Sequence, residues 1–121
     1  LYTIGSVNSS HEMDCIFICP HFVLVLEVKN ITGTIDIDMD TGQLIRTKAD
    51  GTIEQFVNPV LQVNRHLKLL NAALPHVNVV KGIVFSNRQA YLRNIPKHEP
   101  IFHLQRLVPF IEEHVERFKD A

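Results

Sequence analysis

Phe22-Val23-Leu24-Val25-Leu26-Glu27-Val28-Lys29 is the stretch that decides the fold of this chain. Its continuous apolar run, bounded by Pro20-His21 and by Gly33, predicts a buried central strand. A carboxylate and an ammonium at the end of such a strand are costly to bury unless they meet a partner, a metal or a substrate. Side chains alternate between the two faces of a strand, so Glu27 and Lys29 point the same way. Glu27-Val28-Lys29 is therefore the centre of the candidate site.

The length and composition indicate a single globular domain over residues 1–121. The chain is 45% hydrophobic and 21% charged, which suffices for one core. Its net charge of -1 gives no general attraction to nucleic acid, so DNA binding would depend on a local basic patch or on bound metal. No apolar stretch has the length of a membrane span and no secretory signal is visible, so we expect no membrane contact. Because the chain starts at Leu1 without Met, we expect a fragment of a longer protein with fused or partner domains.

Two cysteines, Cys15 and Cys19, both fall in the strand region before the central strand. Residues four apart on a strand are separated by roughly 13 Å. A disulfide needs Cα atoms within about 7 Å, so these two cannot bridge each other. Unpaired thiols favour a reducing, cytoplasmic location. A zinc site is the alternative, but the chain has no second cysteine pair, and small buried apolar residues are the simpler interpretation.

The remaining pattern predicts an α/β domain with a mixed sheet flanked by helices. Asp40-Thr41-Gly42 and Asp50-Gly51 are turn sequences between short strands, and Asn58-Pro59 is typical of a helix N-terminus. The apolar positions Val60, Val63, Leu67, Leu70 and Leu74 recur at helical spacing. We expect strands at 1–7, 13–19, 22–29, 34–39, 43–48, 52–57, 77–85 and 101–104, helices at 59–74 and 105–119, and a polar loop at 86–100.

A second carboxylate, Asp14, lies on the strand before the central one. The short Pro20-His21 link favours an antiparallel hairpin, which would place Asp14 beside Glu27 and Lys29. Hydrolysis of a phosphodiester needs an activated water and neutralised phosphate charge, and Mg²⁺ held by carboxylates and a backbone oxygen supplies both. Asp14, Glu27 and the carbonyl of Val28 are the candidate metal ligands. Lys29 is the candidate to position or deprotonate the water, or to stabilise the phosphate.

Two polar residues of the expected helix, Gln62 and His66, are four apart and share a helix face outside its apolar stripe. Gln62 could orient the Glu27 carboxylate, the lysine or a phosphate. His66 could hydrogen-bond a phosphate oxygen or assist proton transfer.

These residues occur in an order that resembles a known family. The series is His11-Glu12-Met13-Asp14, Val25-Leu26-Glu27-Val28-Lys29-Asn30 with Gly33, Asn58-Pro59-Val60-Leu61-Gln62 with His66, and Gly82-Ile83-Val84-Phe85-Ser86. Each piece alone is nonspecific, but the ordered series resembles the nuclease-related (NERD) domain from about Glu12 to Ser86.

The resemblance implies the restriction-endonuclease-like fold of the PD-(D/E)xK nucleases and cleavage of DNA with Mg²⁺ or Mn²⁺. Asp14 then matches the first acidic metal ligand, Glu27 the second and Lys29 the family lysine. Gln62 and His66 resemble the Gln-x-x-x-aromatic motif of RecB-like nucleases, with histidine in the aromatic place. The family usually has a helix before the first strand, and we expect this helix to be absent from the chain, because the sequence starts at Leu1.

Other interpretations of the same residues stay open. Glu27 and Lys29 can be a plain ion pair at a strand end. The domain can be a noncatalytic module that uses a nuclease fold to bind nucleic acid or a partner domain. The first strand, as an exposed edge, can pair with a second copy, which makes a homodimer a further alternative.

The remaining charged residues have solvated roles as their simplest interpretation. Glu12 is an extra metal ligand or a solvated residue at the strand entry. Asp36, Asp38 and Asp40 lack the helices and terminal Glu of a calcium-binding EF-hand, so we expect a solvated hairpin face. The basic residues that could hold a DNA backbone, or serve solubility, are Arg46 and Lys48 on one strand face and Arg88, Arg93 and Lys97 in one loop.

Overall fold

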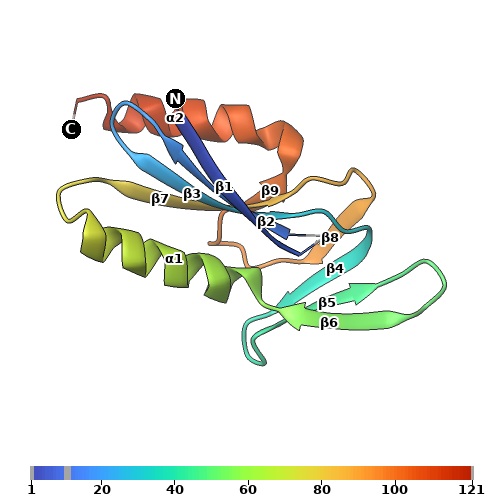
Figure 1. Cartoon of the computed structure of the whole chain (residues 1–121). Coiled ribbons are helices and arrows are strands. Elements are labelled where there is room, and N and C mark those ends of the chain that lie inside the picture. Colours follow the sequence, from blue (N-terminus) through green and yellow to red (C-terminus); the bar gives the residue numbers. More distant parts are fainter. Residues whose placement is uncertain (1, 10–11, 121) are drawn as a thin grey trace.

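The computed structural model describes the chain at residues 2–9 and 12–120, with side chains from Asp14 to Asp120. Within these ranges the chain forms two sheets and two α-helices (Figure 1). The elements are β1 (Tyr2–Ser9), β2 (Glu12–Ile18), β3 (Val23–Lys29), β4 (Gly33–Asp38), β5 (Gln43–Thr47), β6 (Ile53–Val57), α1 (Pro59–Ala73), β7 (Val79–Phe85), β8 (Ala90–Asn94), β9 (Ile101–His103), the 3₁₀ turn Leu104–Arg106, and α2 (Leu107–Phe118).

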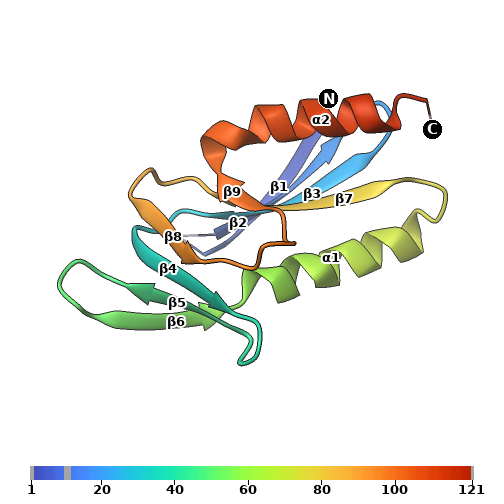
Figure 2. The ribbon, with the colours of Figure 1, turned by 180° about the vertical axis from the view of Figure 1, so that it is seen from behind.

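A five-stranded sheet in the order β1-β2-β3-β7-β9 forms the centre of the molecule. β1, β2 and β3 pair antiparallel, while β7 and β9 continue the sheet parallel to β3. Helices α1 and α2 cover opposite faces of this sheet, as the two opposite views show (Figures 1 and 2). The α/β class and the mixed sheet predicted from the sequence are confirmed, and the architecture is consistent with a restriction-endonuclease-like fold.

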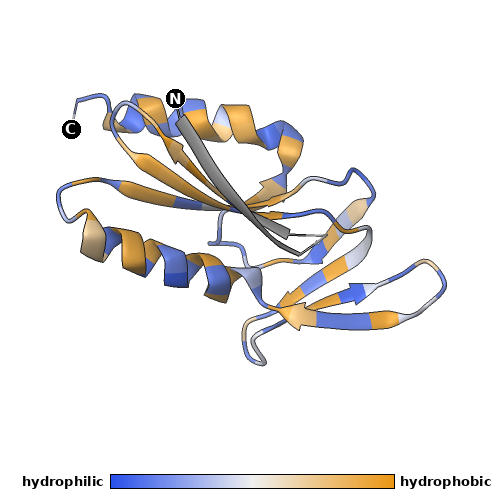
Figure 3. Ribbon diagram, in the orientation of Figure 1, coloured by the Kyte–Doolittle hydropathy of each residue, from blue (hydrophilic) through white to orange (hydrophobic). Residues whose placement is uncertain are grey.

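The apolar run of β3 supplies both layers of the core because successive side chains face opposite helices. Val25 belongs to the cluster on the α1 side, together with Ile83 and Phe85 of β7. Leu24 and Leu26 belong to the cluster on the α2 side. Hydrophobic residues dominate β3 and β7, whereas β5 and β6 contain both polar and apolar residues (Figure 3). The run beginning at Phe22 is thus a central strand, as predicted.

Strands β4, β5, β6 and β8 form a second sheet instead of extending the first. Its order is β6-β5-β4-β8. Gly33 at the start of β4 has a φ of +99°, and a Cβ there would lie 2.7 Å from the carbonyl oxygen of Thr47. Only glycine fits this close approach at a left-handed backbone, so the chain can leave the first sheet directly after Lys29. The sequence had indicated one mixed sheet, because hairpin signals do not say which sheet a hairpin joins.

The predicted polar loop at 86–100 is wrong in its centre, where β8 pairs parallel with β4. A five-residue edge strand with the mixed sequence Ala90–Asn94 carries little periodic signal, and its pairing with β4 stabilises it.

Both helices begin and pack close to the predicted positions. The Asn58 side chain accepts a hydrogen bond from the Val60 backbone at 2.9 Å and Pro59 occupies the first turn, as expected. Val60 and Val63 are buried, but Leu74 caps the helix and is 37% exposed, so its predicted place in the apolar stripe is wrong. The closing helix starts later than predicted, at Leu107, after the 3₁₀ turn. Among the described residues no helix has both the length and the apolar character needed to cross a membrane.

Candidate functional site

The hairpin β2–β3 places Asp14 directly opposite Glu27. The register pairs Asp14 with Glu27 and Glu12 with Lys29 across the two antiparallel strands. Residues that face each other in this way project on the same side of the sheet, with their Cβ atoms about 5 Å apart. Val25 on this side packs in the cluster that α1 covers. The Asp14 and Glu27 side chains therefore project together toward α1.

Lys29 connects this pair of carboxylates to the helix. Its Nζ lies 3.4 Å from Oε1 of Glu27 and donates a hydrogen bond of 3.0 Å to Oε1 of Gln62 on α1. Glu27 is 1% exposed and Lys29 is 2% exposed, so the ion pair is withdrawn from water. The predicted contact between Gln62 and the lysine is present, and Gln62 holds the ammonium beside Glu27.

His66, one turn further along α1, reaches the other carboxylate. Its Nε2 lies 3.9 Å from Oδ2 of Asp14. One ligand atom from each of Asp14, Glu27 and His66 can be chosen so that all three lie within 4.8 Å of one another. The structure therefore brings together Asp14, Glu27, Lys29, Gln62 and His66, which come from three separate elements of the chain.

The electrostatics of the site are dominated by Glu27. Burial, and then a hydrogen bond with the neighbouring Asp14 carboxyl, raise the pKa of Glu27 to about 8, while Lys29 opposes the shift. Both Glu27 oxygens are buried, and their nearest polar neighbours are the Lys29 ammonium and the Asp14 carboxyl. The raised pKa favours the protonated form of Glu27, and a cation beside its two oxygens would favour the charged form instead.

The donor set fits a divalent cation. Carboxylate oxygens are the protein ligands that Mg²⁺ and Mn²⁺ prefer, and an imidazole can add a nitrogen. The Val28 carbonyl, the third ligand expected from the sequence, stays a prediction. Val28 pairs with Met13 and Val84 inside the sheet, and its side chain packs on the α2 side. The side chain of Glu12, the suggested extra ligand, lies outside the described residues.

An open hollow of about 280 Å³ adjoins the site between β2 and α1. Asp14 and His66 lie at its rim, and its other lining residues are apolar: Ile16, Val25, Leu69 and Leu70. This hollow was not predicted from the sequence. A signal was present, because Asp14 and Ile16 share one face of a strand, and His66 and Leu70 share one face of a helix. The hollow gives solvent access to the Asp14 side of the carboxylate pair.

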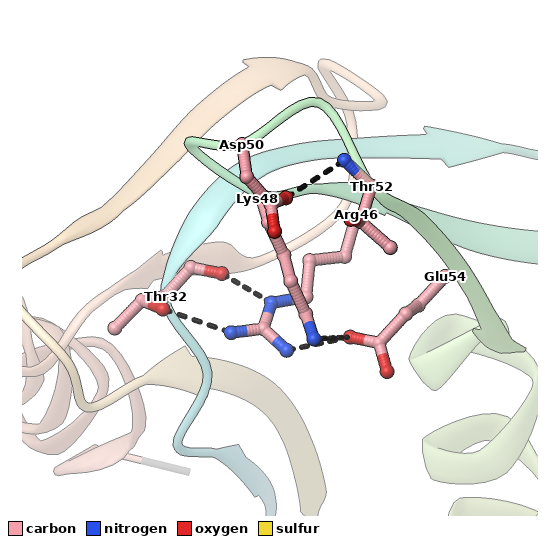
Figure 4. A network of polar contacts seen from close by, with 6 residues as sticks. All are labelled: Thr32, Arg46, Lys48, Asp50, Thr52 and Glu54. Carbon is pink, nitrogen blue, oxygen red and sulfur yellow. Dashed lines mark hydrogen bonds and ion pairs between the residues drawn. The ribbon is translucent and has the colours of Figure 1, made fainter.

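Hydrogen bonds from Ser86 and from Arg46 hold the backbone at and after Lys29. The Ser86 amide donates to the Lys29 carbonyl at 2.9 Å. Arg46 of β5 donates to the carbonyl of Thr32 at 2.6 Å and to its hydroxyl at 2.8 Å (Figure 4). These contacts fix the link between the end of β3 and the second sheet. The local sequence does not predict these hydrogen bonds, because each joins residues that are distant in the chain.

The basic residues expected to hold DNA are partly engaged within the protein. Arg46 and Lys48 share a face, as predicted, and both contact Oε1 of Glu54, at 2.6 Å and 3.5 Å (Figure 4). Arg93 forms a two-pronged pair with Asp36, which also accepts from Asn94, so Asp36 is not a merely solvated hairpin residue. Arg88 and Lys97 are exposed.

The two cysteines are unbridged and buried, as predicted. Cys15 and Cys19 both belong to the cluster on the α2 side, opposite to the face of the carboxylates. Burial raises the pKa of the Cys15 thiol, and the charges of Asp14 and Glu27 add to the shift. Cys15 is therefore an unreactive core residue.

These features define a class of protein: an α/β domain in which a carboxylate, a second carboxylate with a lysine two residues on, and a helix Gln meet at one face of a sheet. A family model for the nuclease-related domain (NERD) matches residues 1–104. The chain belongs to this family, and its function is nuclease-related. No curated protein and no solved structure matches the chain significantly.

Proposed function

We propose that this domain is a metal-dependent nuclease that hydrolyses phosphodiester bonds in DNA at the Asp14–Glu27–Lys29 site. The observation that carries the proposal is the pairing of two carboxylates in register at a buried strand end, with a lysine 3.4 Å from one of them. A purely structural role for this group is costly, because the Glu27–Lys29 pair is withdrawn from water and a second carboxylate, Asp14, lies opposite Glu27. Membership of the nuclease-related family supports the same conclusion.

Asp14 and Glu27 would hold Mg²⁺ or Mn²⁺, with the Val28 carbonyl as the further ligand expected from the sequence. When bound, the ion would lower the pKa of a coordinated water and offset charge on the phosphate. Lys29 would orient this water or stabilise the negative charge that builds up on the phosphate. Gln62 keeps the ammonium in position through its 3.0 Å hydrogen bond. His66, at the rim of the hollow, is placed to meet the substrate side of the site.

The test is cleavage of plasmid and single-stranded DNA in Mg²⁺ or Mn²⁺ by wild type, Glu27→Ala and Lys29→Ala. We expect activity to fall about 10²-fold or more in both variants, because each removes a group that acts on the reacting phosphate. Glu116→Ala and Lys119→Ala are matched controls, since they remove the same residue types from an exposed pair at the end of α2.

Activity that survives both site substitutions would sink the proposal. DNA binding that is unchanged by chelator and by Asp14→Ala, with no cleavage by wild type, would instead identify a noncatalytic nucleic-acid-binding module.

A further inference from the structure

We propose that His66 binds the metal ion directly, and that the Asp14–Glu27–His66 set therefore prefers a first-row transition-metal ion of the Mn²⁺ type over Mg²⁺. The inference rests on the proposed function, because it concerns the ion of the same site. It changes the assignment of His66 from a residue that meets the substrate to a metal ligand.

The separation of the His66 nitrogen from the two carboxylates is close to that of residues that could bind one shared ion. Its Nε2 is 3.9 Å from the Asp14 carboxylate, which is too long for a hydrogen bond. Two ligands bound to one small ion at about 2.1 Å each are at most about 4.2 Å apart. The three ligand atoms lie within 4.8 Å of one another, and three ligands on one such ion lie roughly 3 to 3.6 Å apart, so side-chain rotations that shorten the separations by roughly 1 Å or more would complete the set.

A second, independent feature is the buried carboxylate at the centre of the set. Glu27 is 1% exposed, both of its oxygens are buried, and their nearest polar neighbours are the Lys29 ammonium and the Asp14 carboxyl. Lys29 itself is held by Gln62, one helical turn before His66. A cation placed between Glu27, Asp14 and His66 would satisfy the buried oxygens from the side that Lys29 does not occupy.

His66 also has access to solvent, which a metal site needs for entry of the ion and for bound water. Its side chain is 35% exposed and lines the open hollow beside Asp14. Three protein ligands on one side and an open hollow on the other leave coordination positions for water and a phosphate oxygen.

The chemistry of the donors decides the preference between ions. Mg²⁺ favours oxygen ligands and gives up its water reluctantly, whereas an imidazole nitrogen is a good ligand for first-row transition metals. Two carboxylate oxygens with one imidazole form a mixed set that lowers the relative affinity for Mg²⁺. Mn²⁺ is the suitable probe, because it accepts both donor types and is the alternative ion of the proposed function.

The experiment titrates the 121-residue chain with MnCl₂ and, separately, MgCl₂ by calorimetry, with free Mn²⁺ counted by electron paramagnetic resonance. We expect wild type to bind Mn²⁺ at least tenfold more tightly than Mg²⁺. His66→Ala should weaken Mn²⁺ binding at least tenfold and Mg²⁺ binding less than threefold. His66→Gln, which keeps a polar side chain with an oxygen donor, should show the same loss for Mn²⁺. His76→Ala, an exposed histidine beyond the end of α1, is the matched control.

The contrary outcomes separate the inference from the proposed function. Equal losses for both ions in His66→Ala, or no loss for Mn²⁺, would overturn the inference. The proposed function would still stand if Asp14→Asn abolished metal binding. If wild type binds neither ion, both fail. A thermal melt of each variant without metal shows whether His66→Ala is folded, and His66→Gln gives the answer if it is not.

Discussion

Each of the two sheets carries a lysine–glutamate pair at nearly the same distance, and the two pairs behave in opposite ways. Lys29 and Glu27 are 3.4 Å apart on the five-stranded sheet and are 2% and 1% exposed. Lys48 and Glu54 are 3.5 Å apart on the four-stranded sheet and are both 38% exposed. Distance alone therefore does not distinguish a functional pair from a structural one.

The difference lies in the charge balance and the access of water. Two cations contact the Glu54 carboxylate. Arg46 has the larger effect and Lys48 the smaller one, and both lower the pKa of Glu54. At the buried pair the second neighbour of the glutamate is another carboxyl group: burial and then the Asp14 contact raise the pKa of Glu27 to about 8, against the opposing effect of Lys29. The two cations near Glu54 favour its charged form, whereas the surroundings of Glu27 favour its protonated form.

The largest contrast is expected when each lysine is replaced by methionine. Lys29→Met should lower the free energy of unfolding by about 3 kcal/mol, because it leaves buried acidic groups and the Gln62 oxygen without their ammonium. Lys48→Met should leave the melting temperature nearly unchanged, because exposed pairs contribute little. Urea denaturation at neutral pH with a chelator measures both.

Methionine keeps the length of the lysine side chain, so lost packing contributes little to the comparison. Equal effects of the two substitutions would show that burial does not distinguish the pairs, and the comparison between the sheets would fail.

The second contrast is the direction in which the melting temperature changes when each glutamate is replaced by glutamine. Glu27→Gln should raise the melting temperature of the metal-free protein at neutral pH by roughly 4 °C or more, because the raised pKa of Glu27 means that folding favours uptake of a proton, and the neutral amide needs none. The same variant should lose metal binding. Glu54→Gln should lower the melting temperature slightly, because Arg46 then loses its charged partner.

Scanning calorimetry with and without Mn²⁺ tests whether Glu27 lowers the melting temperature of the metal-free protein and is needed for metal binding. A Glu27→Gln protein that is less stable than wild type without metal would mean that the Glu27–Lys29 pair is a structural ion pair after all.

The sequence predicted most of the elements and the candidate residues because their signals are local. The apolar run ending in Glu27-Val28-Lys29, the short link at Pro20-His21 and the Asn58 cap each depend on neighbours within a few residues. From these alone the strand pairing that sets Asp14 opposite Glu27 could be expected, and the register confirms it. The metal and catalytic roles of these residues stay predictions.

What could not be predicted depends on contacts between distant residues. The second sheet forms because Gly33 fits against Thr47, and β8 exists because it pairs with β4. Arg46 looked like a residue for DNA, but its guanidinium is committed to Thr32 and Glu54. No periodicity or propensity encodes such pairings, since each is decided by tertiary packing.

The smallest expected effect concerns the exposed pair Asp36–Arg93 on the second sheet. Hydrogen bonds from Arg93, and then from Asn94, hold the pKa of Asp36 below its usual value. A carboxylate with a lowered folded-state pKa contributes stability that is complete above its unfolded pKa, about 3.9, and is lost as the pH falls through the folded value. The melting temperature of wild type should therefore exceed that of Asp36→Asn at pH 6, and the gap should shrink below about pH 4. Calorimetry between pH 6 and pH 2.5 measures it. A gap that stays constant over this range would show that the Asp36–Arg93 pair adds no pH-dependent stability to the second sheet.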